Sequence, residues 1–92
     1  MFSTPRVNVI ECDEGFSVEV LGRTGLLYKE GTKIMRISSE VLTATEIALV
    51  KKSIRHWNPP DENDNVDDNK RDAIVENIRR AFRSQGTSIT IW

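Results

Sequence analysis

Residues 67–84 have the spacing of an amphipathic helix, and they limit what the rest of the chain can form. Asp67 or Asp68 is expected to cap the start, arginines gather in the last turns, and Gly86 follows as a stop signal. The apolar side chains recur at intervals of three and four residues, so one helix face must be buried against another layer of the fold. This face contains Ile74, Val75, Ile78, Ala81 and Phe82.

The first forty residues have the alternation of strands instead. Residues 6–13 and 16–21 are predicted to form one hairpin, and residues 26–29 and 33–37 a second. A turn that contains glycine separates the two strands of each hairpin. The N-terminal part of the chain is therefore expected to supply most of a sheet.

Residues 46–57 fit two patterns. Four apolar residues from Ile47 to Trp57 recur at helical spacing, which favours a helix. Ile47 and Leu49 also fit an alternating strand. The residues alone do not decide between helix and strand here.

These elements predict an α+β fold in a single domain, residues 1–92. About five to six strands would form a small, mostly antiparallel sheet that packs against the one C-terminal helix. A final strand, residues 87–92, would follow the helix, with Ile89 and Ile91 facing inward. A chain of this length can bury one modest core.

The composition is that of an ordinary globular domain, with 38% hydrophobic and 29% charged residues. The net charge of -1 provides no bulk attraction to nucleic acid or to membranes. The single cysteine, Cys12, cannot form an intrachain disulfide and fits a reducing compartment. Neither a signal peptide nor a membrane span is recognisable. We therefore expect a cytoplasmic protein.

Few residues offer catalytic or metal-binding chemistry. His56 is the only histidine, and the sequence arranges no nucleophile and orienting acid around it. Together with Cys12 it supplies too few nitrogen and sulfur ligands for zinc. The acidic stretch that begins at Asp61 resembles a calcium loop, but Val66 stands where that loop needs glycine. We therefore expect no catalytic site, no metal site and no cofactor, in a protein that acts by binding another protein.

Arg79, Arg80 and Arg83 form the basic end of the helix. A nucleic-acid patch and the polar face of an amphipathic helix both use such residues. Without interleaved aromatic side chains or excess positive charge, the polar helix face is the favoured interpretation. Glu76 is expected to pair with Arg80, four residues later.

Residues 61–68 hold five acids and no base, in a polar loop before the helix. Asp67 and Asp68 have a structural role at the helix start. Asp61, Glu62 and Asp64 have no such role and few evident local partners, so they are the candidate partner-binding residues. Such a loop would attract a basic protein, although a solvated loop without a binding role fits equally well.

A short motif precedes this loop: Ser53 and Ile54, then Trp57, then Pro59 and Pro60. It resembles a Ser-Ile-x-x-Trp-x-Pro-Pro motif of the immunity protein 74 family of bacterial polymorphic toxin systems. The order of elements is also similar to that family's, with a β-rich first half, a strand that ends in the motif, one helix and a final strand.

The resemblance implies a protein that binds and neutralises a cognate toxin by occlusion, without catalysis. It favours a strand over a helix for residues 47–54, and it places Glu40 at an acidic position of the family. Asn58 departs from the pattern, in which an acid is more common. The motif residues are expected to be structural, with Trp57 in the core. The alternatives are a small self-associating or regulatory domain and, less in keeping with the charge, a nucleic-acid-binding domain; the oligomeric state and the identity of the toxin are not predictable.

Overall fold

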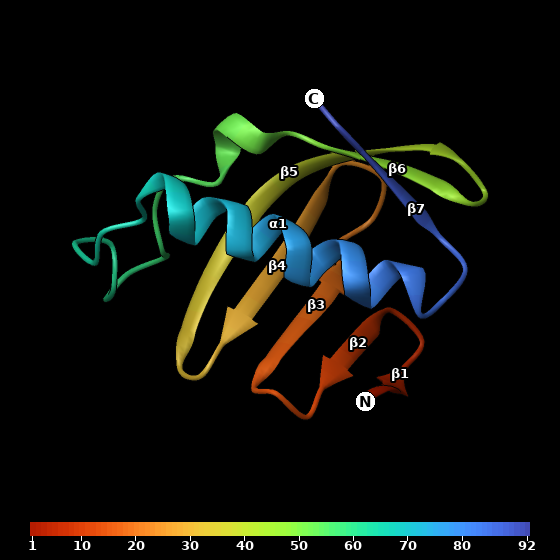
Figure 1. Ribbon diagram of the computed structural model, residues 1–92, viewed down its shortest axis with the longest axis horizontal. Coiled ribbons are helices and arrows are strands. Elements are labelled where there is room, and N and C mark those ends of the chain that lie inside the picture. The colour runs from red at the N-terminus through yellow and green to blue at the C-terminus, as the bar shows by residue number, and fades with distance from the viewer.

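All seven strands of the protein form one curled sheet, and a single helix lies across one of its faces (Figure 1). The computed structural model describes residues 1–92. The strands keep the order of the sequence across the sheet, and each neighbouring pair is antiparallel except β6 and β7, which are parallel. The elements are β1 (Phe2–Arg6), β2 (Val9–Cys12), β3 (Phe16–Val20), β4 (Gly25–Glu30), β5 (Lys33–Thr43), β6 (Glu46–Leu49), the 3-10 turn η1 (Lys51–Ser53), α1 (Asp68–Arg83) and β7 (Ser88–Ile91).

Both predicted hairpins are present. β2 pairs with β3 in the register that sets Ile10 opposite Val18, and β4 pairs with β5 in the register that sets Leu26 opposite Ile37. These four side chains are buried and belong to the face that the helix covers. The alternation of the sequence therefore identifies the inner face correctly.

β1 is a strand that the sequence does not predict. The strand expected over residues 6–13 is interrupted at Val7, which is fully exposed in the turn between β1 and β2. Only Phe2 of β1 packs against the core. An edge strand with one inward side chain gives no alternation to recognise, which is why the prediction started too late.

β5 is long enough to join the two halves of the sheet. Its first residues pair with β4, and its last, from Ser39 to Thr43, pair with β6. The strand is visibly curved between these parts, so β6 and β7 turn toward the helix (Figure 1). The curl brings β7 alongside the C-terminal part of α1.

The ambiguous segment is neither one helix nor one strand. Residues 46–49 form β6, residues 51–53 form η1, and residues 54–57 continue without helix or strand. The strand expected over residues 47–54 is therefore correct only up to Leu49. Ile47, Ile54 and Trp57 are all buried. Ile47 reaches the core from a strand, and Ile54 and Trp57 reach it from the irregular segment after η1, so their helical spacing is a coincidence.

α1 begins and ends close to where its sequence predicts. Oδ1 of Asp67 accepts a hydrogen bond from the backbone N–H of Lys70 at 2.8 Å, so Asp67 is the N-cap. After Arg83 the chain turns at Gly86, whose φ of 76° is a conformation that glycine adopts readily. All the residues of the predicted apolar face are buried: Ile74, Val75, Ile78, Ala81 and Phe82.

An aromatic row runs through the core beneath the helix. Phe2, Phe16, Tyr28 and Trp57 follow one another, with ring centroids separated by 6.0, 6.0 and 6.3 Å. Tyr28 is fully buried, and burial raises its pKa to about 12. Its hydroxyl oxygen accepts a hydrogen bond from the side-chain amide of Asn77 at 2.9 Å. The row therefore joins the first strands and the segment at Trp57 to the middle of α1.

The α+β class and the final strand after the helix are confirmed. The sheet has seven strands, more than the five to six expected, and it is mixed because β6 and β7 are parallel. Cys12 lies in the core, as predicted for a small apolar residue of a strand. No helix of the protein has the length and the apolar character needed to cross a membrane.

Candidate binding surfaces

The motif segment, residues 53–58, covers an edge of β5 that no strand covers. Backbone groups on such an edge need other partners when they are shielded from water. Oγ of Ser53 accepts a hydrogen bond from the N–H of Ser38 at 2.9 Å and donates one to the carbonyl of Val50 at 2.6 Å. One side chain thus ties β5 to the segment that follows β6.

Asn58 closes the next part of the same edge. Its N–H donates to the carbonyl of Ile34 at 2.7 Å, and its Oδ1 accepts from the N–H of Arg36 at 3.4 Å. An aspartate would offer the same acceptor. The departure of Asn58 from the acidic pattern therefore leaves this contact in place.

Ile54 and Trp57 hold the segment in the core, with 0% and 2% of their surfaces exposed. The carbonyl of Ile54 accepts a hydrogen bond from Nε of Arg71 in the first turn of α1, at 2.9 Å. Pro59 and Pro60, joined by a cis peptide bond, are exposed at the start of the loop. The contacts of the buried motif residues are all made inside the fold.

The acidic loop, residues 61–68, lies at the N-terminal end of α1 (Figure 1). Oδ2 of Asp64 is 2.8 Å from Nζ of Lys33 on β5. This hydrogen bond raises the pKa of Lys33 above its ordinary value, and the charges of Asp64 and Asp61 add to the effect. Asp61 is half-buried and Glu62 is exposed. The expectation that Asp64 has no structural role is wrong, because its partner comes from a distant strand.

Most of the other charges around this end of α1 are also paired. Val66 fixes the loop on the core, with 8% of its surface exposed, and three ion pairs involve residues of the first turns of α1. They join Lys70 to Glu30 at 2.6 Å, Arg71 to Asp68 at 2.6 Å and Lys51 to Asp72 at 3.0 Å. Most of the acids near the helix start are therefore engaged within the molecule.

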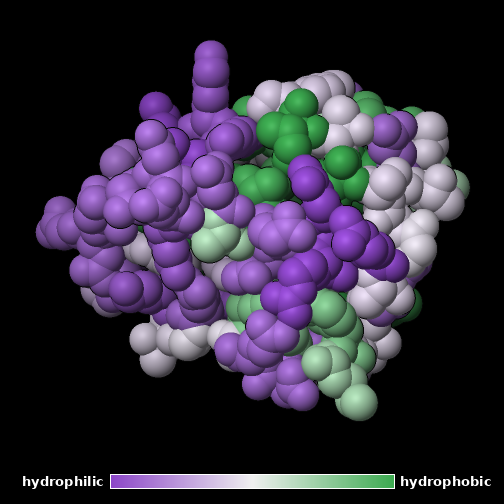
Figure 2. Space-filling model, viewed as in Figure 1, coloured by the Kyte–Doolittle hydropathy of each residue, from purple (hydrophilic) through white to green (hydrophobic).

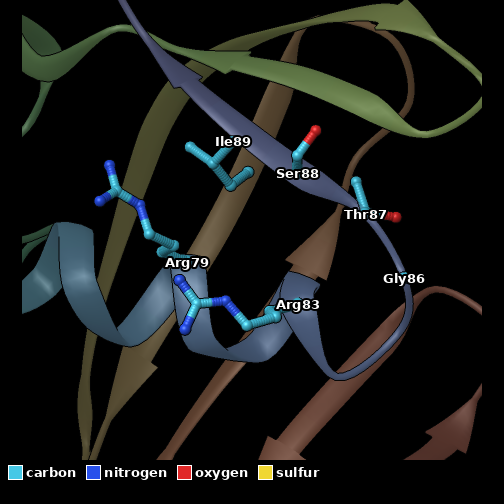
Figure 3. Close-up of a pocket in the computed structure, with 6 residues that line it drawn as sticks. All are labelled: Arg79, Arg83, Gly86, Thr87, Ser88 and Ile89. Carbon is cyan, nitrogen blue, oxygen red and sulfur yellow. The ribbon is translucent and has the colours of Figure 1, made fainter.

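A cleft of about 580 Å³ lies at the other end of α1, between its last turns and β7 (Figure 3). Arg79 and Arg83 project from the helix along one wall, and Ile89 points from β7 toward the helix (Figure 3). The sequence does not predict this cleft, because the cleft depends on the direction in which the chain leaves the helix toward β7. Its lining consists of Arg79, Arg83, Gly86, Thr87, Ser88 and Ile89.

The two arginines of this cleft, which we call the arginine cleft, have no close counter-charge. Arg83 forms no ion pair, and the nearest acid to Arg79 is Glu76, at 3.8 Å. Arg80 is different, because its guanidinium binds both carboxylate oxygens of Glu14, at 3.2 and 2.5 Å. This contact lowers the pKa of Glu14. The predicted pair of Glu76 with Arg80 is therefore wrong.

Hydrophobic surface borders the arginine cleft on the side of β7. Figure 2 shows hydrophobic side chains near this strand, beside the hydrophilic last turns of α1, whereas the side that carries the acidic loop is mostly hydrophilic. Ile91 and Trp92 have 37% and 55% of their surfaces exposed. The cleft is thus basic on the helix wall and partly apolar on the strand wall.

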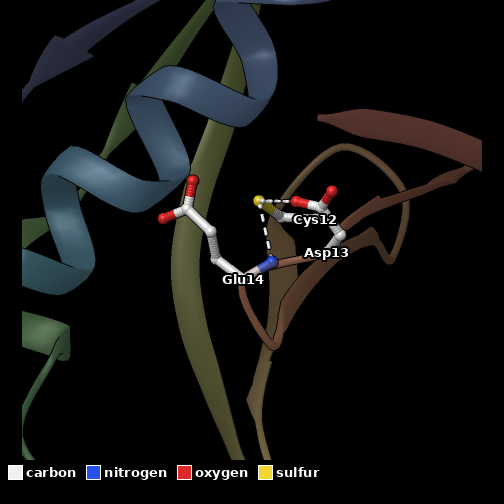
Figure 4. Close-up of side chains that lie close together, drawn as sticks. All are labelled: Cys12, Asp13 and Glu14. Atoms are coloured by element: carbon white, nitrogen blue, oxygen red, sulfur yellow. Dashed lines mark hydrogen bonds between the residues drawn. The ribbon is translucent and has the colours of Figure 1, made fainter.

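The turn between β2 and β3 brings together Cys12, Asp13 and Glu14 (Figure 4). One potential ligand atom from each lies within 4.8 Å of the others. The thiol of Cys12 is buried and accepts a hydrogen bond from the N–H of Glu14 at 3.5 Å. Asp13 binds the terminal ammonium group of Met1 at 2.9 Å, and Glu14 binds Arg80. Each carboxylate already has a cationic partner, so the group serves to fix the turn and the N-terminus.

The order of elements, with the motif segment, one helix and a final strand, is the order that the resemblance implies. The sequence model of the family described as immunity protein 74 matches residues 17–92. The chain belongs to the immunity protein 74 family. No curated protein and no solved structure matches it.

The part that matches the immunity protein 74 family begins at Ser17, in β3. It includes the motif segment, the acidic loop, α1 and β7, whereas β1 and β2 precede it. Both the acidic loop and the arginine cleft therefore belong to the family's part of the fold.

Proposed function

We propose that this member of the immunity protein 74 family protects a bacterial cell by binding a cognate protein toxin in the cytoplasm and covering the toxin's active surface. The family match over residues 17–92 carries the proposal. An immunity protein of this kind needs a stable complementary surface and no catalysis. The charged surfaces at the two ends of α1 suit that task, because charge complementarity selects a partner and speeds its association.

We further propose that the acidic loop contributes a contact through Asp61, Glu62 and Asp64. A toxin that acts on nucleic acid would present a basic surface, which these carboxylates would attract. Asp64 already binds Lys33, so Glu62 and Asp61 would supply most of the attraction. Charges of this kind at the rim of an interface change the association rate more than the affinity.

The test uses the toxin encoded beside this protein and the full chain. Co-expression of the chain should restore growth to cells that produce the toxin, and the purified proteins should form a stable complex. Failure to protect against the neighbouring toxin, together with failure to bind it, would contradict the proposed function. Sedimentation of the chain alone, over a range of concentrations, would identify a protein that merely self-associates.

The loop is tested by Asp61→Asn, Glu62→Gln and Asp64→Asn in one variant. The association rate with the toxin should fall and lose much of its dependence on salt. A control replaces two acids outside the loop by glutamine, Glu11 on β2 and Glu19 on β3. Glu19 is ion-paired to Arg6 at 3.7 Å, so the control, like the loop variant with Asp64 and Lys33, removes one ion-paired acid. Equal rates for the two variants would show that the loop is solvated surface only.

A further inference from the structure

The outer edge of β7 has backbone groups that no strand uses. The N–H groups of Ser88 and Trp92 donate to the carbonyls of Thr45 and Leu49, on the side of β6. Backbone groups alternate between the two sides of a strand, so those of Ile89 and Ile91 face away from β6. β7 is the last strand of the sheet. An added strand could therefore pair with Ile89 and Ile91.

The chemistry of the arginine cleft beside this edge indicates which segment would fit. The only charged residues that line the cleft are Arg79 and Arg83. Arg83 is in no ion pair and Arg79 has only a long contact to Glu76. The chain as a whole has a net charge of -1, so this is a local basic site and not part of a basic surface. An acidic segment matches it, whereas a nucleic acid would need a longer basic track.

The spacing of the two arginines also suits an extended chain. Arg79 and Arg83 stand four positions apart on α1 and thus project from one face, about 6 Å apart along the helix axis. Side chains at alternate positions of a strand lie on the same side, about 6.6 Å apart. Two acids separated by one residue would therefore reach the two guanidinium groups, and the residue on the opposite side would point away from the helix.

We propose that the arginine cleft and the edge of β7 bind an acidic segment of the partner protein as an eighth strand. The segment's backbone pairs with Ile89 and Ile91, and two carboxylates at alternate positions bind Arg79 and Arg83. Strand addition of this kind draws affinity from main-chain hydrogen bonds and specificity from side-chain contacts. That the segment belongs to the toxin rests on the proposed function.

The first experiment uses a soluble peptide of alternating glutamate and valine, blocked at both ends, as the probe of the full-length chain. Its binding should saturate and should shift the backbone amide signals of Ile89 and Ile91 in nuclear magnetic resonance spectra. Arg79→Gln with Arg83→Gln should weaken binding by about tenfold or more, because two charge-assisted contacts are lost. The control variant, Arg23→Gln with Arg55→Gln, removes two exposed arginines that are in no ion pair and should bind the peptide normally.

Several results would overturn the inference. The first is that the variant with Arg79→Gln and Arg83→Gln binds the peptide as tightly as the original chain does. A second is peptide binding without any change at Ile89 and Ile91, or binding that survives methylation of the peptide's backbone nitrogens. A third is equal binding of inorganic phosphate or of a short DNA duplex, which would identify a general anion site.

Growth protection separates this inference from the proposed function. Loss of both toxin binding and protection in the folded Arg79 and Arg83 variant supports the inference that the toxin supplies the segment. Full protection by that variant would overturn that inference while immunity stands. Absence of protection by the original chain would instead overturn the immunity function, and the peptide measurements would still decide whether the cleft accepts an acidic strand.

Discussion

The two ends of α1 carry opposite charges and use them differently. At the N-terminal end, Asp67 caps the helix and Asp64 binds Lys33. At the C-terminal end, Arg83 forms no ion pair and Arg79 reaches only to Glu76, at 3.8 Å. The helix has 16 residues, so the two ends are about 24 Å apart. One end uses most of its charge to hold the fold together, whereas the other binds Glu14 through Arg80 and leaves Arg79 and Arg83 available.

The comparison shows that a cluster of like charges in a sequence does not reveal which charges are free. Five acids in eight residues suggest an unsatisfied surface, yet Asp64 is paired with Lys33 on β5 and Asp68 with Arg71 on α1. The arginines look like an ordinary polar helix face, yet two of them line a cleft. Lys33 lies far from Asp64 in the sequence, and the cleft depends on the path of the chain after Gly86, so the fold decides the outcome in both cases. Five predictions test this difference between the ends.

The largest effect is expected from removal of β7. Deletion of Thr87–Trp92 exposes β6 and the side of the core that Ile89 covers, so the domain should lose its cooperative thermal transition. Deletion of six residues at the opposite edge, Met1–Arg6, should cost less, because only Phe2 packs against the core there. Circular dichroism during heating compares the two. A cooperative transition in the protein without β7 would show that this end of the molecule is dispensable.

The core beneath the two ends should differ in the free energy of unfolding that it contributes. Phe82→Ala, near the end of α1, should lower that free energy by about 3–5 kcal/mol, since the ring is almost completely buried. Val66→Ala, in the acidic loop, removes fewer atoms and should cost roughly 1–3 kcal/mol. Urea denaturation measures both. Equal losses would mean that the loop is anchored as firmly as the helix end.

Between the two ends, Tyr28 makes stability depend on alkaline pH. Its pKa of about 12 in the folded protein exceeds the ordinary value of 10.0, because burial disfavours the phenolate. The folded state thus keeps the proton that the unfolded state loses, and stability from this group is full below pH 10 and is lost as the pH rises toward about 12.

The rise in the pKa of Tyr28 from 10.0 to about 12 corresponds to roughly 2–3 kcal/mol in the free energy of unfolding. Tyr28 is the only tyrosine, so phenolate absorbance reports its titration directly. In Tyr28→Phe the alkaline loss of stability should be smaller by this amount. Titration of the folded protein near pH 10 would show that the hydroxyl is reached by water.

A smaller effect is expected at the helix cap. Asp67→Ala removes the acceptor for the N–H of Lys70 and should lower the free energy of unfolding by about 1 kcal/mol. Asp67→Ser keeps an acceptor and should restore most of the loss. Urea denaturation measures both variants. If both had the free energy of unfolding of the original chain, the carboxylate of Asp67 would have no structural role.

The smallest effect is expected at the arginine cleft. Arg79→Gln with Arg83→Gln should change the free energy of unfolding by no more than about 0.5 kcal/mol, because these side chains hold no close ion pair. Urea denaturation of this variant measures the change in the free energy of unfolding. A loss as large as that of Asp67→Ala would show that both ends of α1 use their charges for stability.

The helix was predictable because several signals agree along it. The cap at Asp67, the five-residue apolar face and the stop at Gly86 all favour the same boundaries. At residues 46–57 the signals conflict, because the short strand β6 and the irregular segment after η1 both bury side chains, whereas the 3-10 turn between them buries none. β1 left no signal, since its polar residues face solvent on both sides. The motif at Ser53–Pro60 identified the family, but its role at the edge of β5 needed the structure.

The binding surfaces were the least predictable part. Asp61, Glu62 and Asp64 stand out in the sequence, but the pairing of Asp64 with Lys33 depends on how β5 lies beside the loop. The arginine cleft depends on the path of the chain after Gly86. Charges close in sequence can be counted in advance, whereas the distances between elements come only from the fold.

The parallel pairing of β6 with β7 has a consequence for the order of folding. The hydroxyl of Thr90 on β7 donates a hydrogen bond to the carboxylate of Glu46 on β6, 44 positions earlier in the sequence. Strands β2 to β5, in contrast, each pair with the strands next to them in the sequence. Local pairings form early and distant ones late, because closing a long loop costs entropy before any contact compensates it. During synthesis, the first five strands can assemble while α1 and β7 are still unmade. Until β7 has left the ribosome, the edge of β6 stays uncovered. We expect the nascent chain to be most vulnerable to aggregation during this period, when it cannot yet bind a partner at β7.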